Sequence, residues 1–112
     1  MAFTPYHNIV GATATQNELV AIDDLPIRSL KCISMANIHD SAAATVDLFI
    51  FKESTDAISP ETYYLIKNVS IPAGVTLLFD NEEVLNFDNI SGGYSLHLEV
   101  GSLDTVDVLL KK

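Results

Sequence analysis

The sequence is poor in several features that would assign it a function directly. It has one cysteine, so no disulfide can form within the chain, and it has no tryptophan. Lysine and arginine number 6 against 15 aspartates and glutamates, which gives a formal net charge of -9. Binding of nucleic acid requires a basic surface that neutralises phosphates, and adsorption to anionic lipid requires one as well. We therefore expect neither nucleic acid nor a membrane as a partner.

Long apolar runs are also missing. No hydrophobic stretch approaches the roughly 18 residues that a membrane-spanning helix needs. The first residues do not combine a basic segment with a following apolar one, so we expect no secretory signal. The 112 residues are 48% hydrophobic and 19% charged, which is enough apolar material for one packed core. A single folded domain is predicted.

An alternation of apolar and polar residues with a period of two is the main structural signal. It is clearest in residues 94–100, where one face would consist of Tyr94, Leu96, Leu98 and Val100. Residues 105–112 repeat the alternation, with Leu109 as the exception. A period of two is typical of a half-buried strand. The short segment 101–104 between them predicts that these two strands form an antiparallel hairpin or a near-hairpin.

Other segments also favour strands, and turn-forming residues separate them. Residues 45–51 are apolar on both faces, which predicts a central strand. The remaining candidates are residues 17–22, 28–38, 62–69, 75–79 and, as a weak edge strand, 84–87. Seven or eight short strands at this spacing predict an all-β fold. We expect an antiparallel β-sandwich of jelly-roll-like form.

The first fifteen residues lack a clear period. Phe3, Tyr6, Ile9 and Val10 are nevertheless more apolar than a solvated tail requires. The segment is either disordered or an extended N-terminal arm that becomes ordered against a neighbour. We expect an arm over residues 1–15 and a β-sandwich domain over residues 16–112, with these four side chains as interface residues. Deletion of residues 1–12 should then leave the sandwich folded.

No arrangement of residues indicates catalysis or a cofactor. His7, His39 and His97 share no spacing that suits a zinc site. Cys32 has no electropositive setting that would activate it, and it is predicted to be a buried thiol. The acidic loop 80–83 lacks the spaced ligands of a calcium loop. We therefore predict no catalytic, cofactor-binding or metal-binding residues and a protein that is not an enzyme.

Residues 62–77 read TYYLIKNVSIPAGVTL. This stretch resembles the pattern YYL-x-K-N-V-x-I/V-P-A-G-x-x-L of small virion structural proteins of tailed bacteriophages. Residues 33–48, 93–96 and 106–108 add loose matches, so that the resemblance covers about residues 27–110. The chain departs from the pattern in its first fifteen residues and in a longer loop at residues 52–61.

The resemblance implies a non-enzymatic virion protein. Its leading form is a capsid decoration (cement) protein, assembled in the host cytoplasm, that binds between major capsid proteins and stabilises the phage head. A homo-oligomer, with a trimer favoured, would suit this task. Alternatives are a neck or tail adaptor or ring component and, more remotely, a carbohydrate-binding β-sandwich, which the lack of tryptophan disfavours. The surplus of acids serves either solubility or complementarity to a basic partner.

Overall fold

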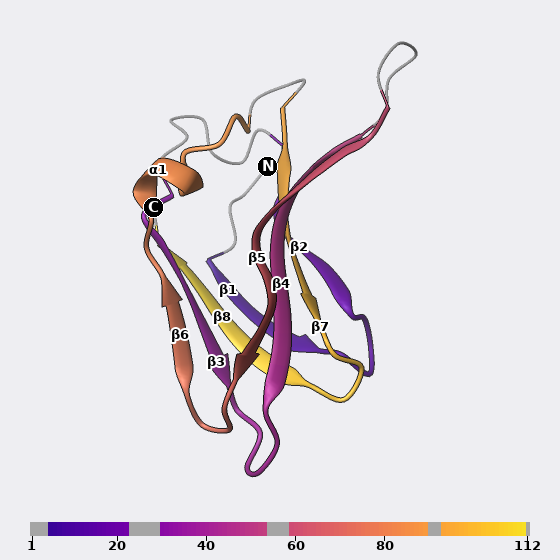
Figure 1. Cartoon of the computed structure of the whole chain (residues 1–112), viewed down its shortest axis with the longest axis vertical. Coiled ribbons are helices and arrows are strands. Elements are labelled where there is room, and N and C mark those ends of the chain that lie inside the picture. Colours follow the sequence, from indigo (N-terminus) through magenta and orange to yellow (C-terminus); the bar gives the residue numbers. More distant parts are fainter. Residues whose placement is uncertain (1–4, 23–29, 54–58, 90–92, 112) are drawn as a thin grey trace.

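The computed structural model describes residues 5–22, 30–53, 59–89 and 93–111. These residues form an all-β structure of two four-stranded antiparallel sheets with one helical turn (Figure 1). The elements are β1 (Tyr6–Val10), β2 (Gln16–Val20), β3 (Cys32–Asn37), β4 (Ala44–Lys52), β5 (Glu61–Ile71), β6 (Thr76–Phe79), α1 (Glu82–Leu85), β7 (Ser95–Val100) and β8 (Thr105–Lys111). Within this part of the chain, no helix is long and apolar enough to cross a membrane.

The two sheets have the strand orders β1-β8-β3-β6 and β2-β7-β4-β5. We call them the β1 sheet and the β2 sheet. The numbers of the paired strands β1 and β8, β2 and β7, β3 and β6, and β4 and β5 each sum to nine. Two further pairings, β3 with β8 and β4 with β7, join these pairs into sheets. As predicted, residues 45–51 lie in an interior strand, because β4 pairs with both β5 and β7.

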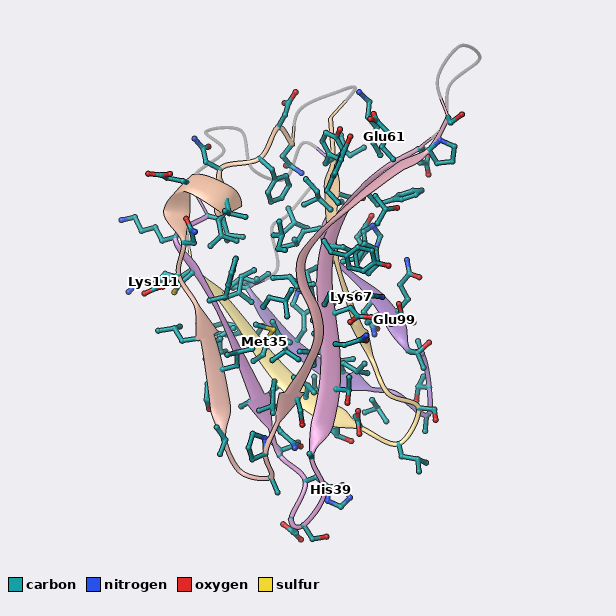
Figure 2. All side chains as sticks on the ribbon, in the orientation of Figure 1. Met35, His39, Glu61, Lys67, Glu99 and Lys111 are labelled. Atoms are coloured by element: carbon teal, nitrogen blue, oxygen red, sulfur yellow. The ribbon has the colours of Figure 1, made fainter. Side chains whose placement is uncertain are left out.

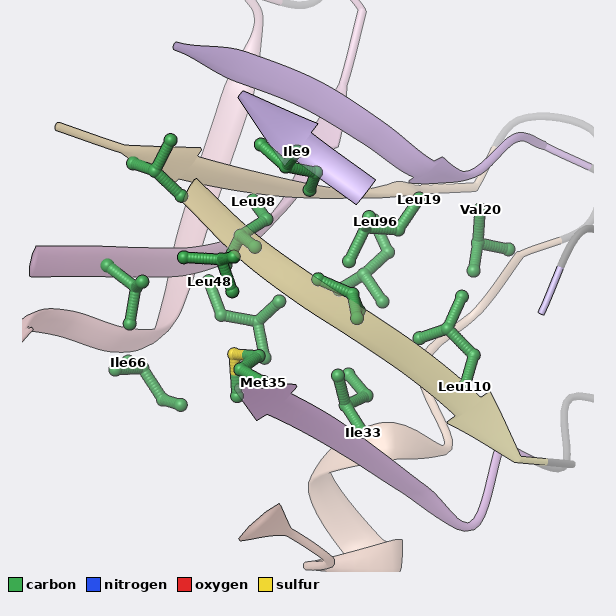
Figure 3. Packing of buried hydrophobic residues seen from close by; sticks show 14 of the residues in the cluster. Ile9, Leu19, Val20, Ile33, Met35, Leu48, Ile66, Leu96, Leu98 and Leu110 are labelled. Carbon is green, nitrogen blue, oxygen red and sulfur yellow. The ribbon is translucent and has the colours of Figure 1, made fainter. Parts of the chain in front are cut away.

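The inward side chains of both sheets belong to one hydrophobic cluster (Figure 3). The predicted inward faces of the last two strands are confirmed, because Leu96, Leu98 and Val100 of β7 and Val106, Val108 and Leu110 of β8 are all buried. Leu109, the exception in the alternation, points outward and is exposed. The period of two was therefore a reliable guide to the buried face of these strands.

The predicted hairpin between the last two strands is wrong. β7 and β8 belong to different sheets, and the turn between them carries the chain across the core. Asp104 holds this crossing, because its Oδ2 accepts hydrogen bonds from the backbone N–H groups of Gly101 and Thr45. Its carbonyl also accepts one from Gly11 N–H. These bonds join the turn between β7 and β8 to Gly11, which follows β1, and to the start of β4.

Residues 84–87 do not form an edge strand. The helical turn α1 occupies the start of this segment, and the side chain of Asn81 caps it by accepting a hydrogen bond from Val84 N–H. Leu85 and Phe87 are both buried and close one end of the core. The apolar residues that suggested a strand therefore belong to the helical turn α1 and the segment after it, and Asn81 caps the start of this turn.

The predicted arm over residues 1–15 is not separate from the sheets. β1 pairs with β8 over Tyr6–Val10, and Leu110 N–H donates to the carbonyl of Pro5. Ile9 is only 3% exposed and belongs to the common core. Sequence reasoning missed this strand because its five residues turn a single large apolar side chain inward. Phe3 lies outside the described residues.

Cys32 differs from its prediction as well. It is partly exposed at the start of β3, where Ile33 and Met35 take the buried positions. Residues 28–38 have apolar side chains on both faces, so the sequence did not show which face is buried. In the structure the face with the larger side chains, Ile33 and Met35, packs in the core.

Candidate functional site

The outward face of the β2 sheet carries a row of side chains that runs across all four strands. Glu18 of β2, His97 of β7, Phe49 of β4 and Tyr64 of β5 lie directly opposite one another in register. The His97 ring stacks on Phe49 at 5.4 Å with an interplanar angle of 9°, and the Tyr64 ring lies 5.3 Å from Phe49 on the other side. Phe49 is thereby buried although it points away from the core.

His97 also has a hydrogen-bonding partner in its own strand. Its Nε2 lies 2.8 Å from Ser95 Oγ and 4.0 Å from a carboxylate oxygen of Glu18. Ser95 Oγ additionally donates to the carbonyl of Phe51 at 3.2 Å. With the hydroxyl proton directed to that carbonyl, Nε2 must carry the proton and donate to Ser95.

A serine, a histidine and a carboxylate in contact invite comparison with a catalytic triad. In a triad the serine and the acid bind opposite nitrogens of the ring, so that the acid orients a base. Here both Ser95 and Glu18 approach Nε2 of His97. Ser95 is also buried beneath the sheet surface. The arrangement is a structural network that fixes the ring of His97.

Burial sets the charge state of His97. The side chain is 12% exposed between its neighbours, and loss of water lowers the pKa of the imidazole below its ordinary value of 6.5. The nearby carboxylate of Glu18 acts in the opposite direction but more weakly. The ring is therefore neutral at pH 7.

The charged part of the same face surrounds a bulge in β5. Opposite Asp47, the β5 strand has an extra residue, and Asn68 adopts a positive φ of 55°. Asp47 stabilises this bulge, because its Oδ1 accepts from Asn68 N–H at 2.6 Å and its Oδ2 lies 3.5 Å from Lys67 Nζ. Lys67 Nζ also lies 4.4 Å from the centre of the Tyr64 ring. Glu99, labelled with Lys67 in Figure 2, pairs with Asp47 across β4 and β7.

A second aromatic cluster lies on the opposite side of the extended β4–β5 pair. Glu61 accepts hydrogen bonds from the hydroxyl groups of Tyr63 at 3.0 Å and Tyr94 at 3.5 Å. The two tyrosine rings meet edge to face, and Lys52 Nζ lies 5.6 Å from the centre of the Tyr94 ring. The hydrogen bond to Glu61 and the charge of that carboxylate raise the pKa of Tyr63. Tyr63 remains half exposed and presents a ring to solvent.

The outward face of the β1 sheet has a different character. Tyr6, Leu109, Ser34 and Leu78 form a row across its four strands, in register from β1 to β6. Tyr6 is 71% exposed, Leu109 49% and Leu78 56%. Val10 at the end of β1 is also exposed. Of the predicted interface residues, the structure therefore brings Tyr6 and Val10 to one exposed apolar face, whereas Ile9 belongs to the core.

The histidines do not come together. His7 lies in β1, His39 in the turn after β3 and His97 on β7, and the Nδ1 atom of His39 accepts hydrogen bonds from Ser41 N–H and Ala42 N–H. Among the residues that the structure describes, no group of three or more histidine, cysteine or acidic side chains could hold a metal ion.

Sequence reasoning named Tyr6 and Val10 of the apolar face of the β1 sheet but did not predict the rest of that face or the aromatic row on the β2 sheet. The signal for the aromatic row was the pair Ser95 and His97, whose spacing of two places both on one side of a strand. The contacts to Phe49 and Tyr64 depend on the register between strands, which the sequence does not reveal. Comparison of the chain with protein-family models, with curated proteins and with solved structures found no match.

Proposed function

We propose that this chain is a non-enzymatic virion structural protein, specifically a capsid decoration protein that binds between major capsid proteins and stabilises the phage head. The observation that carries the proposal is the strand pairing, in which β1 and β8, β2 and β7, β3 and β6, and β4 and β5 each form a pair. This pairing supports a double-sheet jelly roll, in which a ribbon of strand pairs is wrapped around one core.

Jelly rolls occur in viral capsid domains and in lectins, so the link from fold to function is an analogy. Two observations favour the capsid side of that analogy. The sequence TYYLIKNVSIPAGVTL, which resembles small virion proteins, spans β5, the following turn and the start of β6. The acidic residues Glu18, Asp47 and Glu99 also lie together on the outward face of the β2 sheet, which offers a surface for attachment to a basic partner.

The outward face of the β2 sheet supplies the surface that contacts the capsid in this proposal. Glu18, Glu99 and Asp47 outnumber Lys67 on this face and leave it with a net negative charge, and the half-exposed ring of Tyr64 gives it an apolar anchor. Tyrosine is one of the residues that most often dominate binding energy in interfaces. The surface therefore suits a basic region of a partner subunit, with charge directing the encounter and the aromatic ring contributing contact area.

The test is cosedimentation with empty shells made from the major capsid protein of the same genome. We expect saturable binding at a fixed ratio of copies to shell. Glu99→Lys should weaken attachment, because it places a positive charge on the contact face, where it faces Asp47. Glu83→Lys is the matched control, since this exposed residue makes the same charge change in α1, outside the β2 sheet.

Failure to bind shells would contradict the decoration proposal. Binding to purified neck or tail complexes instead would favour an adaptor or ring component. The cluster of Tyr63, Tyr94 and Glu61 places an exposed ring beside a carboxylate, which is the arrangement that carbohydrate recognition uses. Retention on immobilised glycans, lost in Tyr63→Ala, would therefore favour the carbohydrate-binding alternative.

A further inference from the structure

The outward face of the β1 sheet is the most apolar exposed surface of the described strands. Tyr6, Leu109 and Leu78 stand in one row across the sheet, and Val10 lies at the end of β1 on the same side. Ile38, which directly follows β3, is also exposed, and its N–H donates to the carbonyl of Thr105. Several exposed apolar side chains on one face of a sheet are typical of a binding surface.

The sizes of the side chains on the outward face of the β1 sheet would allow two copies of this face to fit together. β3 runs through its middle with the small outward residues Ser34 and Ala36, which are partly exposed. The larger side chains of Leu109 on β8 and Leu78 on β6 flank them. An identical face turned about a two-fold axis can place its exposed leucines over the small residues Ser34 and Ala36, which is the self-complementarity that a two-fold interface needs.

The charge of this face also points to a second copy. The four strands of the β1 sheet contain only two charged side chains, Asp107 and Lys111, which balance each other. Asp107 is further engaged by a hydrogen bond of 2.7 Å from the side-chain amide of Asn8. The chain as a whole has a net charge of -9, so its negative surplus lies elsewhere. A basic partner would be drawn to that surplus, whereas a neutral apolar face allows two acidic chains to meet.

We propose that the outward face of the β1 sheet binds a second copy of this chain, face to face across a two-fold axis. The two stacked sheets would lie about 10 Å apart with their strands rotated by about 30°, as sheets pack within proteins. The proposal goes beyond the proposed function, which needs only attachment to a shell. It also leaves the acidic face of the β2 sheet on the outside of the pair.

The size of the face sets the expected affinity. Four strands and about six rows of residues cover roughly 20 by 20 Å. The pair would then bury on the order of 1,000 Å² in total, at the lower end of specific interfaces. We expect a weak contact of this size to have a dissociation constant of about 1–100 µM. The dimer should therefore be visible at high concentration and dissociate on dilution.

The test is sedimentation equilibrium of the full chain from about 1 to 500 µM. We expect a monomer–dimer equilibrium in the wild-type protein. Leu109→Glu and Leu78→Glu should each weaken it at least 10-fold, because each buries a carboxylate without a partner. Leu103→Glu is the matched control: this residue is 86% exposed in the turn between β7 and β8, outside the face, and its variant should dimerise like the wild type.

Cys32 provides a second measurement. It is the only cysteine, lies at the edge of the face opposite Lys111, and is partly exposed. Its alkylation should slow as the protein concentration rises in the wild type and should not do so in Leu109→Glu. A wild-type chain that stays monomeric, or that forms a trimer, would overturn the proposal. So would a dimer that Leu109→Glu leaves intact. None of these results affects the proposed function, which shell binding tests separately.

Discussion

His97 is the residue whose surroundings respond most directly to pH. Its neutral ring stacks on Phe49 and meets Phe51 edge on at 5.9 Å, and a proton would place a charge there. Because burial lowers the folded-state pKa below 6.5, the unfolded chain binds the proton more readily. Stability from this group is complete above pH 6.5 and is lost as the pH falls through the lowered pKa. We expect the melting temperature to fall between pH 7.5 and pH 5.5.

His97→Phe isolates this contribution. The variant keeps an aromatic ring on Phe49 and leaves Ser95 able to donate to the carbonyl of Phe51. Its melting temperature should vary less over the same interval. An equal pH dependence in the two proteins would show that another group is responsible.

Asn37 is a buried polar residue that joins three segments. Its side-chain amide donates to the carbonyls of Ala42 at 2.8 Å and Ile71 at 2.9 Å, and its Oδ1 accepts from His39 N–H. Replacement by leucine would leave these groups without their partner in a buried site. We expect Asn37→Leu to lower the free energy of unfolding by about 2–4 kcal/mol in urea denaturation. A loss below about 1 kcal/mol would mean that water takes over the bonds.

At the scale of elements, β1 gives the sharpest test. Ile9→Ala should cost about 2–4 kcal/mol, because it opens a cavity in the common core. Tyr6→Ala in the same strand should cost less than about 1 kcal/mol, since Tyr6 lies outside the core. Both are measured by denaturant unfolding at a concentration where the protein is monomeric. Equal small losses would mean that β1 is a detachable arm, as the sequence suggested.

The bulge in β5 depends on a backbone conformation that few residues adopt. Asn68 has a positive φ, which asparagine and glycine tolerate and β-branched residues do not. We expect Asn68→Val to lower the free energy of unfolding by about 1–3 kcal/mol, whereas Asn68→Gly should remain close to the wild type. Thermal or urea unfolding of both variants distinguishes a backbone requirement from a side-chain one.

The sequence predicted where most strands lie because the core requires alternation. The alternation alone predicts that Leu96, Leu98, Val106 and Val108 are buried, even when the neighbouring strands are not known. Alternation does not tell which strands pair, and the short turn after Val100 therefore suggested a hairpin that does not form. Nor does alternation reveal a bulge, which shifts the register of β5 against β4 through Asp47 and Asn68.

The candidate surfaces were harder to predict than the strands. Tyr6 and Val10 were expected at an interface because they are apolar, and both are exposed. Their partners Leu109 and Leu78 could not be named, because only the register β1-β8-β3-β6 brings them into one row. The surface of a sheet is formed by residues that are far apart in the sequence. Local patterns do not show which distant strands become neighbours.

The charge of the whole molecule separates the two proposed contacts. With a net charge of -9, two copies repel each other, and salt screens this repulsion. We therefore expect self-association to strengthen when sodium chloride is raised from about 50 to 500 mM. Attachment of the acidic face to a basic shell should weaken over the same range. The checks are sedimentation equilibrium and cosedimentation; parallel responses would show that charge does not distinguish the contacts.

The strand pairing also determines the order in which the molecule can be assembled. β4 and β5 are the only consecutive strands that pair within the described part of the chain. β1 and β3 both pair with β8, which follows every other described strand in the chain. Non-local pairing of this kind slows folding, because a large loop must close first. β3 can pair with β6 before β8 is made, whereas Ile9 of β1 lacks the strand that pairs with β1 until residues 105–111 have been synthesised.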